Sequence, residues 1–164
     1  MRHALAVAAG VLLADQLGKA LLIDLMAGRS FQPIEITGFF RIVMVWNDGV
    51  SFGLLDGPDA AGVKRWVLVA VALAVVGGLV LWLRRVRETW VALALGAIVG
   101  GALGNVVDRV ARGAVADFFD VHGWGWHWPA FNVADAAISL GVIALVADGL
   151  LHRRGAPHNG GPPA

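Results

Sequence analysis

Long apolar runs separated by shorter polar segments dominate the pattern of the chain. Residues 66–83 contain neither a charged residue nor a hydroxyl group, and tryptophans stand at both ends of this run. About 20 apolar residues span the hydrocarbon core of a bilayer, so the run predicts a transmembrane helix. Similar runs lie at about 90–108 and about 131–151, and a fourth at about 4–26 is interrupted by a few polar residues. The pattern therefore predicts four transmembrane helices.

The first apolar run shares some features with a cleaved signal peptide, because it follows the basic residue Arg2 and has a suitable length. However, Asp15, Gln16 and Lys19 interrupt it, and no clean small-x-small cleavage site follows. We therefore expect this run to be a retained helix.

The distribution of basic residues predicts the orientation of the helices. The short segment 84–89 holds three arginines, and the C-terminal tail adds Arg153 and Arg154. Under the positive-inside rule, this segment and both termini should be cytoplasmic. A raw count of basic residues gives no bias, so the prediction depends on charge density in the short loop. It leaves two segments outside, at about 27–65 and about 109–130.

The outer segments have the composition of strands and of an interfacial loop. Residues 39–46 and 115–121 are rich in β-branched and aromatic side chains, which predicts short strands. The stretch 122–129 is dense in tryptophan, which favours the bilayer interface. We expect the Gly- and Pro-rich tail at 155–164 to be a disordered cytoplasmic tail. The predicted fold class is an all-α membrane protein, with four transmembrane helices, a small extracytoplasmic β-structure and an interfacial loop in a single domain over 1–154.

The composition agrees with a membrane protein and excludes several function classes. The 164 residues are 58% hydrophobic and 15% charged, with a mean hydropathy of +0.71, whereas soluble domains average about 45–50% apolar and about 25% charged residues. Such a chain is not intrinsically disordered. A net charge of +1 argues against a nucleic-acid-binding protein. The absence of cysteine excludes disulfides, thiolate metal sites and cysteine nucleophiles.

The polar residues of this apolar chain gather in a few clusters. An ionisable group near or inside the bilayer is costly unless it faces protein or water, so each one is a functional hypothesis. The clusters are Asp15-Gln16-x-x-Lys19, Trp46-Asn47-Asp48-Gly49-Val50-Ser51-Phe52-Gly53, Gly104-Asn105-x-x-Asp108-Arg109 with Val115-Ala116-Asp117-Phe118, and Phe131-Asn132-x-Ala134-Asp135.

Two aspartates are candidates for a catalytic pair. Asp135 lies a few residues into the fourth predicted helix, and Asp117 lies on the outer segment 109–130, which can fold back to meet it. Two carboxyl groups in a partly dry site share one proton, so they can activate a water and protonate a leaving amide. That is the chemistry of aspartic proteases. The alternative is that Asp135 caps the helix and Asp117 is solvated.

The third predicted helix carries a stripe of small residues and a polar end. Glycines recur every four residues and allow a neighbouring backbone to approach closely; they are Gly96, Gly100 and Gly104. Asn105, Asp108 and Arg109 then share one face of the helix end. Asp108 and Arg109 can alternatively form a structural ion pair, and Asp15 and Lys19 can pair within their own helix.

Other polar residues have simpler interpretations. Asn47 and Gly49 lie between a predicted strand and a turn, and Asn-Asp-Gly is a strong turn former. His122 and His127 lie near aspartates, but their spacing matches no familiar metal site, so we expect no metal. No serine stands in a G-x-S-x-G elbow, which argues against serine catalysis.

These clusters, in this order, resemble those of the lipoprotein signal peptidase (signal peptidase II) family of bacteria. The resemblance extends from Asp15 to about Asp148. The matching pieces are Asp15-Gln16-x-x-Lys19, Asn47-x-Gly49-x-Ser51-Phe52, Gly104-Asn105-x-x-Asp108-Arg109, Val115-Ala116-Asp117-Phe118 and Phe131-Asn132-x-Ala134-Asp135-x-x-Ile138. The chain departs from the family at Ser51, where alanine is more common, and in the Gly- and Trp-rich stretch between the two aspartates.

The resemblance implies a four-helix aspartic peptidase of the bacterial cytoplasmic (inner) membrane, with both termini cytoplasmic. Such an enzyme removes the signal peptide of prolipoproteins by cleaving on the amino side of the diacylglyceryl-modified cysteine. Asp117 and Asp135 would be its catalytic pair. The residues that would bind substrate or support the site are Asp15, Asn47, Gly49, Asn105, Asp108, Arg109 and Asn132. The implied partners are the lipidated prolipoprotein and membrane lipids, with no cofactor, no nucleic acid and a monomeric chain.

Two other classes of function remain open at this stage. A small oligomeric proton-coupled transporter could use Asp15, Asp108 and Asp135 as a relay, although four helices are few, no inverted repeat is visible and the acids cluster toward one surface. A non-catalytic assembly factor could bind a partner through the glycine-rich helix, but it leaves the paired aspartates unexplained.

Overall fold

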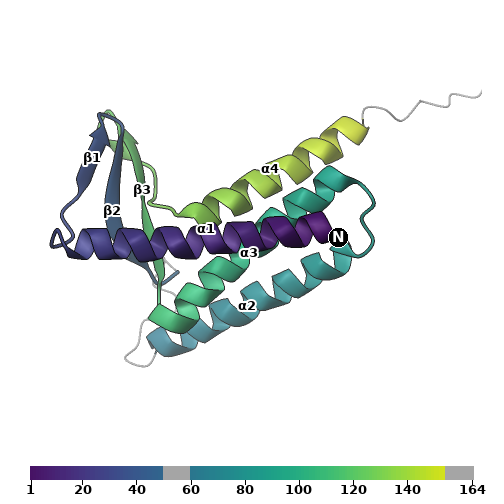
Figure 1. Cartoon of the computed structure of the whole chain (residues 1–164), viewed down its shortest axis with the longest axis horizontal. Helices are drawn as coiled ribbons and strands as arrows, with labels where there is room; N and C mark the ends of the chain where they lie inside the picture. Colours follow the sequence, from purple (N-terminus) through teal and green to yellow (C-terminus); the bar gives the residue numbers. More distant parts are fainter. Residues whose placement is uncertain (50–59, 154–164) are drawn as a thin grey trace, which may run out of the picture.

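The computed structural model describes residues 1–49 and 60–153, which form long helices and a small sheet at one end of the helix bundle (Figure 1). All four helices are long and apolar enough to cross a membrane. In chain order, the elements are α1 (Arg2–Ala27), β1 (Ile34–Thr37), β2 (Phe40–Asn47), α2 (Ala60–Leu83), α3 (Thr89–Arg112), β3 (Val115–Gly123), β4 (Trp126–His127) and α4 (Val133–Arg153). The fold is therefore that of a multi-pass membrane protein with a small β-structure, as the sequence predicts.

Two helices are longer than the sequence indicates, so the outer segments are shorter than 27–65 and 109–130. α2 begins at Ala60, before the apolar run itself begins. α3 continues past residue 108 to Arg112 and ends at Gly113, whose φ of 90° is the left-handed conformation that favours glycine. The charged residues that appeared to end this helix are accommodated within it, because Arg112 pairs with Asp108 one turn earlier.

Two parts of the predicted organisation lie outside the described residues. Ser51 and Phe52 of the second polar cluster fall within 50–59, and the tail at 155–164 follows the described part of α4. The boundaries of the single domain, 1–154, therefore remain a prediction.

α3 is the central helix of the bundle, and its glycines are the reason. A Cβ atom on Gly96 or Gly100 would collide with the backbone carbonyl oxygens of Ala4 and Ala8 on α1. On the neighbouring face, a Cβ atom on Gly101 would lie 2.5 Å from the carbonyl oxygen of Ala134 on α4. The predicted close approach of a neighbouring backbone is confirmed. α1 and α4 both pack directly on α3, which brings their polar residues to its C-terminal half.

The other helices carry their apolar side chains outward. Large side chains such as Leu21 on α1, Val71 on α2 and Ile143 on α4 are exposed in the isolated chain. A bilayer replaces water around such side chains, so this surface is the expected lipid-facing surface of a membrane bundle.

The sheet is antiparallel, with the strand order β1-β2-β3-β4. The predicted strands at 39–46 and 115–121 correspond to β2 and β3, and Val45 lies opposite Asp117 in their register. β1 was not predicted, because its alternating run of only four residues is too short to indicate a strand by itself.

The tryptophan-dense stretch 122–129 is a β-hairpin tip rather than an irregular loop. Gly123 pairs with Trp126, and the two residues between them, Trp124 and Gly125, have φ values of 49° and 80°. Positive φ at both central positions is the signature of the type I′ turn that joins tightly paired strands. Trp124 is fully exposed at this tip.

Candidate active site

The two predicted catalytic aspartates come from different elements that meet at the sheet end of the bundle. Asp117 lies on β3 and is 1% exposed, and Asp135 lies in the first turn of α4. The backbone around Phe131 ties these elements together, since Phe119 N donates to Phe131 O (2.9 Å) and Phe131 N donates to Phe119 O (3.1 Å). This bridge holds the residues just before α4 against β3. The two carboxyl groups are close enough that the charge of Asp135 acts on Asp117.

Asn132 contacts both aspartates. It precedes α4, and its Oδ1 accepts a hydrogen bond from Asp135 N (2.9 Å), while Asn132 N donates to Asp135 Oδ2 (3.3 Å). This reciprocal arrangement is a capping box. Asn132 Nδ2 also donates to Asp117 Oδ1 (2.7 Å). Asp135 therefore does take part in a helix cap, as the alternative interpretation expects, and it also shares the donor residue Asn132 with Asp117. Asp117, in contrast to that alternative, is buried and not solvated.

Two further asparagines complete the set of donors. Asn47 Nδ2 donates to Asp117 Oδ2 (2.9 Å), and Asn105 Nδ2 donates to Asp135 Oδ1 (2.8 Å). Asn47 Oδ1 also accepts a hydrogen bond from Gly49 N (2.9 Å), where Gly49 has a φ of 95°. The turn predicted at this position thus directs an amide toward the site. Each oxygen of both carboxyl groups accepts at least one hydrogen bond.

The surroundings of Asp117 favour its neutral form. Burial raises the pKa of Asp117 to about 6, and the charge of Asp135 acts in the same direction. Hydrogen bonds from Asn47 and Asn132 act against this and lower the pKa. A carboxyl group with a raised pKa beside a second carboxyl group can hold the single proton that paired-carboxyl catalysis requires.

A buried ion-pair network lies directly behind the carboxyl pair. Lys19 Nζ is 2.7 Å from Asp15 Oδ2 and 2.7 Å from Asp108 Oδ2, and all three side chains are fully buried. The predicted pairing of Asp15 with Lys19 within α1 is confirmed. The alternative ion pair of Asp108 with Arg109 is wrong, because Asp108 pairs with Lys19 and with Arg112. Since the predicted pairing considered only neighbours on one helix, it missed this contact between α1 and α3.

Arg109 makes no ion pair with that network among the described residues, although the charge of Asp108 acts on it. Its Nη1 donates to Asn105 O (3.3 Å), and its charge acts on both Asp135 and Asp117. Its Nε is buried and has no hydrogen-bond partner within residues 1–49 and 60–153. A buried donor without a partner is rare in folded proteins, and this one lies next to the two carboxyl groups.

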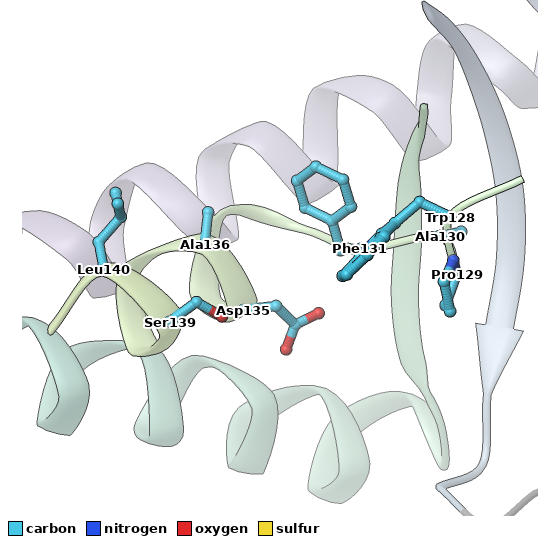
Figure 2. A pocket seen from close by; sticks show the side chains of 8 residues that line it. All are labelled: Trp128, Pro129, Ala130, Phe131, Asp135, Ala136, Ser139 and Leu140. Carbon is cyan, nitrogen blue, oxygen red and sulfur yellow. The ribbon is translucent and has the colours of Figure 1, made fainter. Parts of the chain in front are cut away.

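An open pocket of about 460 Å³ adjoins Asp135 (Figure 2). Its wall is mainly apolar, and Asp135 is the only ionisable residue among the described residues that line it. The lining residues, which run from the hairpin to the second turn of α4, are Trp128, Pro129, Ala130, Phe131, Asp135, Ala136, Ser139 and Leu140. A mostly apolar cavity with a few placed polar groups, here Asp135 and Ser139, is the usual form of a ligand site.

His127, in the outer segment, links the two strands of the hairpin through Asp120. His127 Nδ1 lies 3.1 Å from Asp120 Oδ2, and Arg41 Nε donates to the same oxygen (2.7 Å). Burial raises the pKa of Asp120, but the hydrogen bonds from His127 and Arg41 outweigh it and hold the pKa below its usual value. Throughout the described part of the chain, no group of three or more potential ligands is arranged to hold a metal ion. Sequence reasoning missed the cluster of Arg41, Asp120 and His127, because these residues meet only through the pairing of β2 with β3 and of β3 with β4.

Four membrane-length helices, with a buried Asp117 and a half-buried Asp135 sharing hydrogen-bond donors at one end of the bundle, are the features of a membrane-embedded hydrolase of the aspartic type. The family model for Signal peptidase (SPase) II matches residues 7–151. The chain belongs to this family.

Relatives and solved structures agree with this assignment. The chain is 50% identical to the lipoprotein signal peptidase of Methylorubrum extorquens (strain PA1) over 137 residues, which cover 80% of this chain and 79% of that protein. It is 37% identical to the lipoprotein signal peptidase of Vibrio cholerae serotype O1 (strain M66-2), over 90% of this chain and 86% of that protein. Its fold matches that of a solved bacterial membrane enzyme with a TM-score of 0.78 at 23% identity, covering 99% and 96% of the two chains. Nothing in these findings supports the transporter alternative.

Proposed function

We propose that Asp117 and Asp135 are the catalytic pair with which this signal peptidase II removes the signal peptide of prolipoproteins. Cleavage falls on the amino side of the diacylglyceryl-modified cysteine, at the outer face of the cytoplasmic membrane. The observation that carries the proposal is the shared set of asparagine donors, in which Asn132 contacts both carboxyl groups and Asn47 and Asn105 each contact one.

The pair works with one proton between its two members. The ionised carboxylate takes a proton from a water molecule, whose oxygen attacks the scissile carbonyl carbon, while the neutral carboxyl group protonates the carbonyl oxygen. In the resulting diol, the carboxyl group that is now neutral gives its proton to the scissile nitrogen, and one diol hydroxyl gives a proton to the ionised carboxylate. The carbon–nitrogen bond then breaks, and the pair ends with its single proton. Burial of Asp117 supports its role as the neutral partner at rest.

The supporting residues have distinct roles in this proposal. Asn132, Asn105 and Asn47 orient the carboxyl groups, and the conformation of Gly49 allows the Asn47 turn. Arg109 supports the pair through its charge, which acts on both Asp135 and Asp117. Asp15 and Asp108, the remaining two predicted site residues, accept hydrogen bonds from backbone N–H groups next to the pair.

The substrate is recognised at the membrane surface. The apolar wall beside Asp135 suits a lipidated peptide, whose acyl chains remain in the bilayer while its peptide bond reaches the carboxyl pair. Trp124 at the hairpin tip, with Trp126 and Trp128 nearby, supports contact of the sheet with the bilayer interface. Hydrolysis needs only water and the two carboxyl groups, so the proposed enzyme uses no metal and no organic cofactor, and one chain supplies the whole site.

The orientation follows from the ends of the bundle. The N-terminus, the connection between α2 and α3 and the C-terminal end of α4 lie opposite the sheet (Figure 1). The connection carries the arginines of residues 84–89, which favour the cytoplasm. We place both termini in the cytoplasm and the sheet with the carboxyl pair on the outer side.

A cleavage assay in detergent tests the proposal. A diacylglyceryl-modified prolipoprotein and its unlipidated counterpart are incubated with the purified chain, with and without a metal chelator, and the products are separated on a gel. We expect cleavage of the lipidated substrate alone, at the same rate with chelator. Equal cleavage of both substrates would contradict the proposed recognition, and loss of activity with chelator would contradict the metal-free mechanism.

A further inference from the structure

Lys19 is the centre of a buried network that reaches both carboxyl groups of the proposed pair. Its Nζ is 2.7 Å from Asp15 Oδ2 on its own helix and 2.7 Å from Asp108 Oδ2 on α3. The positive charge of Arg112 balances Asp108 from the other side, so the two buried carboxylates face two cations. Buried charges are tolerated in a membrane protein only when they are paired in this way.

Each of these carboxylates also holds a backbone N–H next to a proposed catalytic aspartate. Asp15 Oδ1 accepts a hydrogen bond from Ala134 N (3.0 Å), and Ala134 immediately precedes Asp135. Asp108 Oδ2 accepts a hydrogen bond from Ala116 N (3.2 Å), which is next to Asp117 on β3. One carboxylate therefore fixes the first turn of α4 and the other fixes β3. The two contacts, Asp15 with Ala134 N and Asp108 with Ala116 N, are of the same kind, although the two carboxylates come from different helices.

The contact of Asp15 with Ala134 N depends on a close approach of the Asp15 side chain to the backbone of α3 at Gly104. A Cβ atom on Gly104 would lie 2.5 Å from Asp15 Oδ2, so only glycine leaves room for this carboxylate between α1 and α3. Ala134 N belongs to the first turn of α4, whose backbone donors lack partners within the helix. A carboxylate is favoured at this position by the helix dipole as well as by the hydrogen bond.

A third connection runs through a side chain. Lys19 Nζ donates to Asn105 Oδ1 (3.3 Å), and Asn132 Nδ2 donates to the same oxygen (3.3 Å). Two donors on one oxygen fix the orientation of the Asn105 amide, and its Nδ2 therefore points at Asp135 Oδ1 (2.8 Å). Without Lys19, the amide loses one of the contacts that distinguish its oxygen from its nitrogen.

We propose that Lys19 is a positioning residue of the reaction: by holding Asp15, Asp108 and Asn105, it fixes where the carboxyl groups of Asp117 and Asp135 stand relative to each other. This proposal rests on the proposed function of the pair. Lys19 does not touch the substrate, and its effect is on the geometry of the reacting groups. Misplacement of reacting groups by about 1 Å lowers turnover by about 100-fold.

The test compares Lys19→Met and Lys19→Arg with the wild-type chain in the cleavage assay with lipidated substrate. Arg29→Met is the matched control, because Arg29 is exposed just beyond the end of the same helix. For Lys19→Met we expect kcat to fall by about 100-fold while KM changes by less than about threefold. We also expect the basic limb of the pH profile to move to higher pH, because the charge of Lys19 lowers the pKa of Asp117.

The pH readout separates positioning from a merely structural role, because loss of folded protein lowers activity without moving the profile. The charged groups that act on Asp117 besides Lys19 are Asp135 and Arg109, and these remain in this variant together with the Asn47 and Asn132 donors. A kcat of folded Lys19→Met within threefold of wild type, or an unmoved pH limb, would overturn the proposal.

Lys19→Arg decides the question if Lys19→Met does not fold. The guanidinium keeps the charge but cannot place one nitrogen against both carboxylates and the Asn105 amide in the same way. We expect a lower kcat with an unchanged KM, and wild-type turnover by this variant would overturn the proposal. Inactive wild-type protein, or an Asp117→Asn variant as active as wild type, would instead contradict the proposed function itself.

Discussion

At Asp117, burial and hydrogen bonding act in opposite directions on one carboxyl group. Burial raises its pKa to about 6, and the Asn47 and Asn132 amides lower it. The pair is active with one proton, so activity falls as the pH rises through the upper apparent pKa and the second carboxyl group ionises. We expect the basic limb of kcat/KM for the wild-type chain near pH 6, which a pH series of the cleavage assay measures.

Asn47→Ala removes one of the donors that stabilise ionised Asp117. The pKa of Asp117 should rise further, and the basic limb should move to higher pH. A hydrogen bond to a charged group contributes about 1.5–3 kcal/mol, so the shift is roughly one pH unit or more. Asp48→Asn is the control, because Asp48 lies in the same turn and is exposed. A basic limb that moves to lower pH in Asn47→Ala would show that the hydrogen bond favours the neutral form.

That Asp117 and Asp135 lie in one cluster could be predicted from sequence, but the network behind them could not. Asp117 and Asp135 were recognisable because carboxyl groups are rare in such an apolar chain and stand in a family pattern. The contact of Lys19 with Asp108 depends on the packing of α1 against α3, which the spacing within one helix does not report. The i, i+4 spacing of Asp108 and Arg112 did carry a signal that α3 continues past Asp108.

At the scale of elements, the glycines of α3 determine how closely the helices approach. Gly100→Ala places a Cβ atom against the carbonyl oxygen of Ala8 on α1, where neither backbone can move easily. We expect the free energy of unfolding to fall by about 1–3 kcal/mol. Thermal unfolding in detergent micelles measures this change.

Gly77→Ala is the matched control on α2. A Cβ atom there meets nothing within 4 Å, so this change should leave stability unchanged or raise it by about 0.5–1 kcal/mol through helix propensity. Equal losses in Gly100→Ala and Gly77→Ala would contradict the close packing of α1 on α3.

The elements of the outer segments were only partly predictable. β2 and β3 have clear runs of β-branched and aromatic residues, whereas β1 and β4 are short and become strands only by pairing with them. The turn at Trp124 and Gly125 was missed because the tryptophans around it favoured an interfacial loop. Exposure at the bilayer interface and strand pairing are compatible, and this segment combines them.

At the scale of the whole molecule, the sheet occupies one end of the bundle and the connection between α2 and α3 occupies the other (Figure 1). The carboxyl pair, on β3 and in the first turn of α4, lies at the sheet end, and the connection carries the arginines of 84–89. The chain has no cysteine, so single cysteines report topology without background. In intact cells of a host with an outer membrane made permeable, a membrane-impermeant thiol reagent should label Gly38→Cys in the turn between β1 and β2. It should label Arg87→Cys only after the inner membrane is opened. The reverse pattern would contradict the proposed orientation.

Turnover of Asp117→Asn and Asp135→Asn on the lipidated substrate tests the central claim most directly. Each substitution removes a carboxyl group while keeping its size, and each variant is compared with wild type for thermal unfolding in the same detergent. The carboxyl-pair mechanism predicts that both folded variants lose cleavage to the background level. Wild-type turnover by either folded variant would contradict it.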